Sequence, residues 1–275
     1  MSPGELKADL ADEIIVITGG GGVLCSTIGK GLAENGATVA LLDIDEDAAA
    51  EVADEIQQDG GTALPVACDV LDKDSLRAAT ETVESELGTP TTVINGAGGN
   101  KPEATTAPDM EFFDLPQEAV QWVFNLNFVG TLVTSQVFGR TLADEGRGQI
   151  LNISSMNAFR PLTKIPAYSA AKAAVSNFTQ WLAVHMSHNH SEDIRVNAIA
   201  PGFFLTQQNR FLLIDEDTGD LTDRGQTIID HTPQDRFGRP EDLIGTTLWL
   251  LSSSSSFVHG TVIPVDGGFS AFSGV

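Results

Sequence analysis

The sequence predicts an α/β fold, in which a doubly wound parallel sheet of about seven strands carries helices on both faces. Short apolar runs alternate with helical patterns from residue 14 onward, which is the repeat of a parallel sheet with crossover helices. The chain has 275 residues, 41% of them hydrophobic, so it is long enough to bury one large core. Because we find no linker and no internal repeat, residues 1–275 are predicted to form a single domain.

Seven short apolar runs are predicted to be the strands of this sheet. Continuous apolar runs, as opposed to alternating ones, are typical of parallel strands that are covered on both faces. In chain order, the predicted strands are residues 14–17, 38–42, 63–67, 92–94, 150–153, 194–199 and 261–265.

The segments between the strands repeat apolar residues at helical spacing and are predicted to be helices. In chain order, the predicted helices are residues 24–35, 46–58, 73–87, 116–144, 166–189 and 240–251. Residues 203–238 differ, because they mix Asp, Gly, Thr and Gln with two short apolar stretches and fit no strand. A long excursion from the carboxyl end of a strand is a common place for a mobile cover, so this segment is predicted to be a substrate lid.

The chain is strongly acidic. It has 15 Lys and Arg against 38 Asp and Glu, which gives a formal net charge of −23. Such a charge repels nucleic acid and anionic membrane surfaces, so the expected partner is a small molecule. It also favours a halophilic protein that stays soluble in a high-salt cytoplasm, with an ordinary acidic surface as the alternative interpretation.

The expected cellular location is the cytoplasm. Cys25 and Cys68 are the only two cysteines, which favours buried thiols in a reducing compartment over a disulfide. Residues 1–13 lack the basic and apolar regions of a signal peptide, and no apolar stretch reaches 18 residues.

No metal site is predicted. The cysteines do not have metal-ligand spacing, and His185, His188 and His190 do not share one face of their predicted helix. A solvated helix end is the preferred interpretation of these histidines.

A hydroxyl, a phenol and an ammonium occur at a spacing that suits carbonyl chemistry. Ser155 follows a predicted strand, and Tyr168 and Lys172 lie four residues apart on a predicted helix. Strand ends are where parallel sheets bind ligands, so the three side chains could meet at one carbonyl group. Because an ammonium favours the ionised form of a neighbouring phenol, Lys172 is expected to lower the pKa of Tyr168. The alternative is a partly exposed tyrosine beside a solvated lysine, but Tyr168 is the only tyrosine in the chain.

The segment after the first strand is typical of a nucleotide-binding turn. Residues 18–25 read Thr-Gly-Gly-Gly-Gly-Val-Leu-Cys and open a helix, whose N-terminus offers unpaired N–H groups to a phosphate. Asp43 ends the second strand, where its carboxylate can accept hydrogen bonds from a ribose diol and repel a 2'-phosphate. These features predict a Rossmann-like sheet that binds NAD in preference to NADP, unless Asp43 is a solvated residue that starts a turn.

Five separated motifs occur in the order found in the short-chain dehydrogenase/reductase family, which the chain resembles over essentially its whole length. The motifs are the glycine-rich turn, Asp69 in Cys-Asp-Val, residues 95–98 as Asn-Gly-Ala-Gly, Ser155 with Tyr168-x-x-x-Lys172, and Pro201-Gly202 before Thr206. The resemblance implies an enzyme that uses NAD to transfer a hydride to or from a carbonyl carbon.

The resemblance also implies roles for single residues. Tyr168 would transfer the proton, Ser155 would polarise the carbonyl group, and Lys172 would bind the ribose. Asn127 would hold a water of the proton relay and complete the catalytic set of Asn127, Ser155, Tyr168 and Lys172. The residues implied in cofactor binding are Gly19, Gly22, Val23, Leu24, Asp43, Asp69, Val70, Asn95, Ala97, Gly98, Tyr168, Lys172, Pro201, Gly202 and Thr206. By the same resemblance the protein would be a homotetramer, with the helices at 116–144 and 166–189 at one interface.

The glycine turn departs from the family pattern. Thr-Gly-x-x-x-Gly-x-Gly is usual, and here Val23 and Cys25 take the second and third glycine positions. Gly22 could serve one position earlier, and the side chain of Cys25 is expected to press on the close packing of the helix.

Cations near the catalytic residues favour a substrate that carries a carboxylate. Arg160 and Lys164 lie between Ser155 and Tyr168, and Arg210 lies in the expected lid, in a chain with 15 cations. Surface salt bridges are an equal alternative for each of the three. The predicted substrate-binding residues are Ser155, Asn157, Arg160, Lys164 and Arg210.

Within the family, the chain resembles the branch that interconverts D-fructuronate and D-mannonate. The resemblance rests on residues 154–172, 178–185 and 201–206. One alternative is a dehydrogenase of another keto-gluconate or polyol. A second is a nucleotide-sensing protein that keeps the fold without turnover.

Overall fold

The computed structural model describes residues 9–206, 210–215 and 218–274 and contains a seven-stranded parallel sheet in the order β3-β2-β1-β4-β5-β6-β7. Its strands are β1 (Ile14–Thr18), β2 (Thr38–Asp43), β3 (Thr62–Ala67), β4 (Thr92–Asn95), β5 (Gly148–Ile153), β6 (Ile194–Pro201) and β7 (Val262–Val265). Each of the predicted strands is confirmed. The order reverses between β1 and β4, which places a ligand crevice at the carboxyl ends of these strands.

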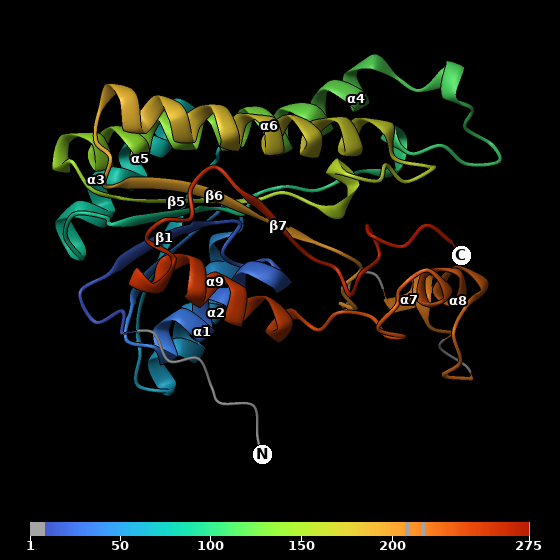
Figure 1. Ribbon diagram of the computed structural model, residues 1–275, viewed down its shortest axis with the longest axis horizontal. Helices are drawn as coiled ribbons and strands as arrows, with labels where there is room; N and C mark the ends of the chain where they lie inside the picture. The colour runs from blue at the N-terminus through green and yellow to red at the C-terminus, as the bar shows by residue number, and fades with distance from the viewer. Residues whose placement is uncertain (1–8, 207–209, 216–217, 275) are drawn as a thin grey trace.

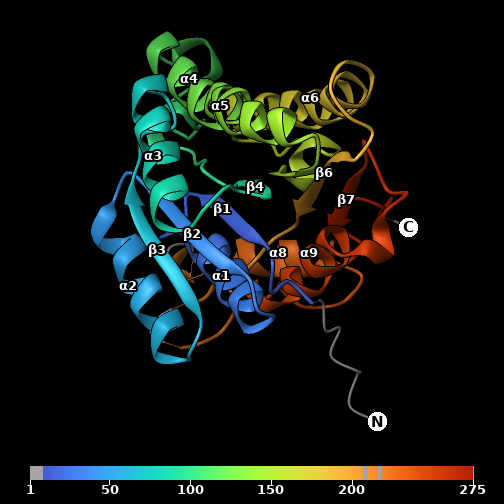
Figure 2. The same ribbon diagram turned by 90° about the vertical axis from the view of Figure 1, so that its left-hand side faces the viewer.

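Helices cover both faces of the sheet (Figure 1). On one face lie α1 (Val23–Glu34), α2 (Glu46–Gln58) and α9 (Ile244–Leu251). The other face carries α3 (Lys73–Glu86), α4 (Gln117–Phe124), α5 (Gly130–Glu145) and α6 (Pro166–Asn189). Figure 2 shows the sheet between the two helical layers, so the predicted single-domain, doubly wound fold is confirmed.

The two faces have separate hydrophobic cores because successive residues of a strand point in opposite directions. Ile15 and Ile17 of β1 belong to the core under α1 and α9, whereas Val16 belongs to the core under α5 and α6. All three side chains are fully buried. Burial on both faces explains why the strands read as continuous apolar runs.

The predicted helix at 116–144 differs from the prediction in its middle. Between α4 and α5, residues Asn125–Val129 form a π-helical segment, and the N–H of Gly130 donates to the carbonyl of Asn125. One additional residue in a turn leaves the apolar periodicity almost unchanged, so the sequence pattern did not reveal it. Such segments are frequent at functional sites, and Asn127 lies in the middle of this one.

The predicted lid contains two short helices, α7 (Arg210–Leu213) and α8 (Asp223–Asp230), which lie beyond the carboxyl ends of the strands (Figure 1). Its two ends are joined, because Gly238 donates to the Phe203 carbonyl at 2.8 Å and Leu205 donates to the Gly238 carbonyl at 3.0 Å. Residues 207–209 and 216–217 of the predicted lid, and residues 1–8 of the N-terminal segment, lie outside the described residues.

Candidate active site

A cleft of about 450 Å³ opens at the carboxyl ends of the central strands. It is lined by Ser155 and by almost all of the residues that were predicted to bind the cofactor: Gly19, Gly22, Val23, Leu24, Asp43, Asp69, Val70, Ala97, Gly98, Tyr168, Lys172, Pro201, Gly202 and Thr206. Asn95 is the exception, because its side chain is buried beneath the cleft. The cleft therefore joins the predicted nucleotide site to the predicted catalytic residues.

Sequence reasoning missed several further residues of this cleft as site residues: Cys25, Ile44, Cys68, Gly99, Leu126, Ile153 and Ser154. Most of them are direct neighbours of predicted residues. Extending each motif by one residue on either side would have found those neighbours.

Ser155, Tyr168 and Lys172 converge as their spacing predicted. Ser155 follows β5 and is hydrogen-bonded to Tyr168, on the first turns of α6. The Lys172 Nζ donates to the Ile153 carbonyl at 2.8 Å and lies 5.6 Å from the centroid of the Tyr168 ring. The N–H of Asn157 donates to the Ser155 Oγ at 3.2 Å, which leaves the Ser155 proton free to point toward Tyr168 or a substrate.

Burial dominates the electrostatics of this group. It raises the pKa of Tyr168, against the opposing effect of the Ser155 hydrogen bond. It also lowers the pKa of Lys172 to about 8, with Cys25 opposing. The expectation that Lys172 lowers the pKa of Tyr168 is therefore not met by the protein groups alone. Because the pKa of Lys172 lies below the raised pKa of Tyr168, the lysine has lost its charge by the pH at which the phenol ionises and cannot offset the burial.

The main chain of Lys172 is fixed to the sheet. Ser154 Oγ donates to the Lys172 carbonyl at 3.1 Å and is 2.7 Å from the Ser176 Oγ. These contacts join α6 to the end of β5, so the helix that carries Tyr168 cannot slide freely along the strand.

Asn127 lies beneath the cleft and does not line it. Its Nδ2 donates to the Gly99 carbonyl at 2.6 Å and to the Val123 carbonyl at 2.7 Å, and its Oδ1 accepts from the Gly99 N–H at 3.2 Å. A Cβ atom added at Gly98 would lie 2.6 Å from the Asn127 Oδ1 and 3.3 Å from the Lys172 Nζ. Asn127 therefore supports the loop after β4 from below, beside Lys172.

The glycine turn forms a cradle that fits a pyrophosphate. The helix α1 has Gly22 as its N-cap with no side-chain cap, so its first N–H groups are available to an anion. A Cβ atom at Gly19 would lie 2.9 Å from the Cα of Ala97, and Gly19 has a φ of +69°. At Gly22 an added Cβ atom would meet only the Gly19 carbonyl, at 3.2 Å, so this side of the turn is open.

Cys25 is accommodated because residue 96 is also a glycine. A Cβ atom at position 96 would overlap with the Cys25 Sγ. The thiol thus fills the space between α1 and the loop after β4, and burial raises its pKa to about 12. Because Gly96 has no side chain, Cys25 does not disturb the close packing of the helix as was expected.

Asp43 both starts a turn and lines the cleft. Its Oδ2 accepts from the Gly21 N–H at 2.9 Å, and its Oδ1 accepts from the Asp45 N–H at 3.1 Å. Each oxygen keeps a lone pair for a ribose hydroxyl. Within the described residues, Lys172 is the only cation that lines the cleft.

The predicted substrate-binding cations do not gather in the cleft. Arg160 is exposed, and its Nε donates to the Ser270 carbonyl at 3.1 Å. Lys164 and Arg210 are exposed as well, and Asn157 is buried beside Ser155. Among the predicted substrate-binding residues, only Ser155 lines the cleft. Arg160 instead holds the C-terminal segment, which its position in the sequence did not reveal.

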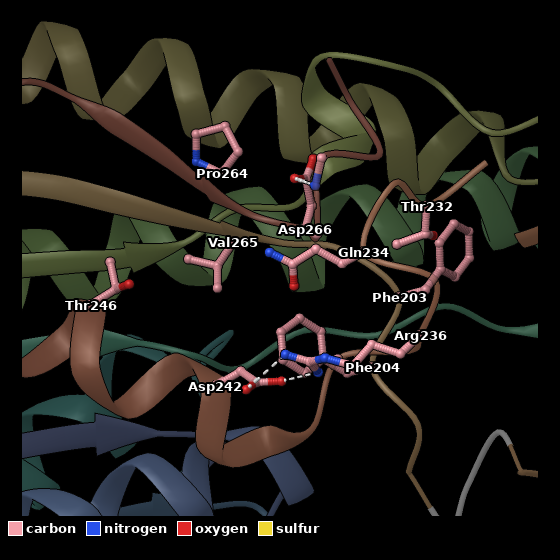
Figure 3. A pocket seen from close by; sticks show the side chains of 13 residues that line it. Phe203, Phe204, Thr232, Gln234, Arg236, Asp242, Thr246, Pro264, Val265 and Asp266 are labelled. Atoms are coloured by element: carbon pink, nitrogen blue, oxygen red, sulfur yellow. Dashed lines mark hydrogen bonds and ion pairs between the residues drawn. The ribbon is translucent and has the colours of Figure 1, made fainter. Parts of the chain in front are cut away.

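A second hollow, of about 390 Å³, lies between the end of the lid, β7 and the start of α9 (Figure 3). It shares no lining residue with the cleft. Its charged groups are satisfied within the protein, because Arg236 pairs with Asp242 at 2.6 Å and Asp266 accepts from Gly268 and Ser270, both at 2.9 Å. We therefore place the chemistry in the first cleft.

The described residues contain no cluster of three or more His, Cys, Asp or Glu side chains that could hold a metal ion. Both cysteines are buried and free. Within the same part of the chain, every helix is too short or too polar to cross a membrane.

Comparisons of the sequence and of the structure with known proteins both find oxidoreductases. A family model described as enoyl-(acyl carrier protein) reductase matches residues 24–270. An uncharacterized oxidoreductase of Bacillus subtilis is 49% identical over 279 residues, which cover 98% of this chain and 99% of the relative. A crystal structure from Haemophilus influenzae with bound NAD, provisionally named a D-mannonate oxidoreductase, is 49% identical, covers 98% of both chains and has a TM-score of 0.91.

Two relatives from Escherichia coli carry more specific names. The 7alpha-hydroxysteroid dehydrogenase is 33% identical over 253 residues, which cover 92% of each chain. The 5-keto-D-gluconate 5-reductase is 30% identical over 260 residues, which cover 94% of this chain and 96% of the relative.

Proposed function

Because this chain belongs to the short-chain dehydrogenase/reductase family and is an oxidoreductase, we propose that it uses NAD(H) to interconvert a keto-sugar acid and its hydroxy acid. The proposed pair is D-fructuronate and D-mannonate. The observation that carries the reaction type is the meeting of Ser155, Tyr168 and Lys172 in one nucleotide-sized cleft. The alternative of a protein that only senses a nucleotide is set aside, because relatives along the whole chain are reductases and dehydrogenases.

The cleft provides a site for each part of the dinucleotide. The N-terminus of α1 and the glycine turn would hold the pyrophosphate, and Asp43 would accept hydrogen bonds from the adenosine ribose. Asp69 and Val70 would contact the adenine, and Thr206 the nicotinamide carboxamide. When bound, the nicotinamide ring supplies or accepts the hydride. Asp43 favours NAD over NADP, because its carboxylate would repel a 2'-phosphate and, among the described residues, Lys172 is the only cation that lines the cleft.

In the reduction direction, Tyr168 donates its phenolic proton to the carbonyl oxygen of the substrate. Its raised pKa keeps that proton in place at neutral pH, which suits a proton donor. Ser155 donates a second hydrogen bond to the same oxygen, since its Oγ already accepts from the Asn157 N–H. Lys172, at a pKa of about 8, still carries its proton at pH 7 and can bind the nicotinamide ribose.

The substrate proposal rests on similarity to relatives whose names refer to sugar acids. The Haemophilus influenzae structure, at 49% identity, bears the mannonate name, and the reductase from Escherichia coli at 30% identity acts on 5-keto-D-gluconate. A second keto-gluconate is the alternative substrate.

Initial rates with D-fructuronate and NADH in molar KCl test this proposal, beside NADPH and a panel of 5-keto-D-gluconate, other keto-sugar acids and a 7-oxo steroid. The proposal predicts fast NADH oxidation with D-fructuronate and slow oxidation with the rest. Fast turnover of another keto acid would leave the assignment as an oxidoreductase unchanged, but that acid would replace D-fructuronate as the proposed substrate. A preference for NADPH would overturn the role of Asp43.

A further inference from the structure

The π-helical segment and the first turns of α5 are polar on the side that packs on the sheet, near the active site. Asn127, Thr131 and Ser135 follow one another at intervals of four residues and are 0%, 4% and 5% exposed. Such positions are ordinarily apolar, because a buried polar group costs free energy unless it is hydrogen-bonded. The next turn returns to the apolar pattern with Phe138 and Leu142.

The hydroxyls of Thr131 and Ser135 each donate to the main-chain carbonyl four residues earlier, so the two bonds follow one another along the helix. The Thr131 hydroxyl donates to the Asn127 carbonyl at 2.9 Å, and the Ser135 hydroxyl donates to the Thr131 carbonyl at 2.7 Å. The series therefore connects Ser135 to the π-helical segment that holds Asn127 under Gly99.

The same series continues across the sheet. Asn95 of β4 donates to the Ser135 Oγ at 2.9 Å and to the Asn152 Oδ1 at 2.7 Å. Asn152 of β5, which is paired in register with Asn95, donates to the Thr179 Oγ1 of α6 at 2.8 Å. The network thus links the helix that carries Asn127 to the helix that carries Tyr168 and Lys172, through the ends of two strands.

Hydrogen bonds fix position in a way that apolar contacts do not, because they are directional and hydrophobic contact is not. The network also leaves one buried acceptor, the Asn95 Oδ1, without a hydrogen-bond partner in the described structure. An apolar core would avoid that cost, so stability alone does not account for this polar layer.

We propose that Ser135, together with Asn95, Asn152 and Thr179, is a positioning residue for the reaction. The network fixes the positions of α5 and α6 along the direction of the strands. In these positions Asn127 supports the Gly98–Gly99 loop, and Tyr168 and Lys172 face the cleft. A displacement of about 1 Å in such a group costs about a hundredfold in rate. The proposal rests on the oxidoreductase activity, but it does not depend on which keto acid is the substrate.

The test compares Ser135→Ala with Thr134→Val. Thr134 is the neighbouring residue, is fully buried and has a hydroxyl without a partner in the described structure, so it is a matched control. We expect kcat of Ser135→Ala to fall about ten- to hundredfold with KM for NADH unchanged, and kcat of Thr134→Val to stay at the wild-type value. Rates are taken with whichever keto acid the wild-type enzyme reduces fastest, so a wrong substrate assignment does not affect the comparison.

Two further readouts separate positioning from general stability. If Ser135 acts through Asn127, then Ser135→Ala produces little additional loss of kcat in an Asn127→Ala background. Amide exchange of Gly99, whose N–H is bonded to the Asn127 Oδ1, should be faster in Ser135→Ala and unchanged in Thr134→Val, and this measurement needs no turnover.

A second variant, Thr179→Val, changes the other end of the network and should show the same loss of kcat. It replaces Ser135→Ala in the test if Ser135→Ala does not fold. Wild-type kcat and wild-type Gly99 exchange in a folded Ser135→Ala or Thr179→Val protein would overturn the proposal.

Discussion

Lys172 holds a buried positive charge at the base of the cleft. Its side chain is 4% exposed, and burial lowers its pKa from 10.5 to about 8. A lysine whose pKa is lower in the folded than in the unfolded state destabilises the fold below the folded value, where both states bind the proton. That penalty is relieved as the pH rises from about 8 to about 10.5, because the unfolded chain then binds more protons than the folded protein.

We therefore predict that Lys172→Met abolishes turnover but raises the free energy of unfolding at pH 7 by about 1–3 kcal/mol. The advantage over the wild-type protein should shrink as the pH is raised above 8. Urea denaturation at pH 7 and at higher pH measures both effects, with exposed Lys73→Met as the control. A Lys172→Met variant that is less stable than the wild type at pH 7 would contradict the claim that the buried charge of Lys172 destabilises the fold.

At the residue scale, the motif residues were predictable and the substrate residues were not. Ser155, Tyr168 and Asp43 lie at strand ends or on a helix that the sheet positions, so their place follows from the fold. Arg160 and Lys164 lie on a loop, where sequence proximity does not set the direction of a side chain. The pKa of Tyr168 was also not predictable, because it depends mainly on how deeply the phenol is buried.

At the scale of elements, the strands and most of the helices followed from the apolar pattern, whereas the π-helical segment at Asn125–Val129 did not. Its signal lies in tertiary contacts. The Asn127 Nδ2 caps the Val123 carbonyl, and Asn127 also binds both backbone groups of Gly99. An isolated helix could make the contact with Val123, which is four residues earlier, but not the two contacts with Gly99.

The contact between α1 and the loop after β4 gives a prediction at this scale. Gly96→Ala would place a methyl group against the Cys25 Sγ and 2.7 Å from the Thr18 carbonyl. Since the loop or α1 must move, we expect a loss of about 1–3 kcal/mol in the free energy of unfolding, with weaker NADH binding. At Gly99 the nearest atom to an added Cβ is the Leu126 Cδ2 at 3.8 Å, so Gly99→Ala is the control and should leave stability unchanged. Equal denaturation midpoints for the two variants would show that the contact is not tight.

At the scale of the whole molecule, the net charge of −23 dominates. The described residues form few ion pairs to offset it, and most of these pairs are exposed, such as Arg77 with Asp74 and Arg140 with Asp144. Exposed pairs of this kind contribute little to stability. Self-repulsion between acidic groups is therefore relieved mainly by dissolved salt.

We predict that the melting temperature rises between low salt and about 1 M KCl, where the Debye length is about 3 Å. Differential scanning calorimetry at several KCl concentrations, with activity measured in parallel, follows the effect. A melting temperature that does not respond to KCl would favour the ordinary acidic surface over the halophilic interpretation.

The homotetramer remains a prediction. The exposed face of α6 is the feature of the structure that supports it. This helix contains no Asp or Glu over its 24 residues, in a chain with 38 acidic residues. Its Trp181 is 57% exposed and stacks between Phe178 and His185. Two highly charged copies would approach most easily through such an uncharged face.

The most direct test of the account is NADH oxidation with D-fructuronate by the wild-type protein and by Tyr168→Phe, with NADH binding measured on the same samples. We predict rapid turnover by the wild type, and a loss of about a thousandfold or more in Tyr168→Phe with the same Kd for NADH. The phenyl ring keeps the shape of the site and lacks only the proton donor. Turnover that survives in Tyr168→Phe would contradict the assignment of Tyr168, and with it the mechanism derived from this cleft.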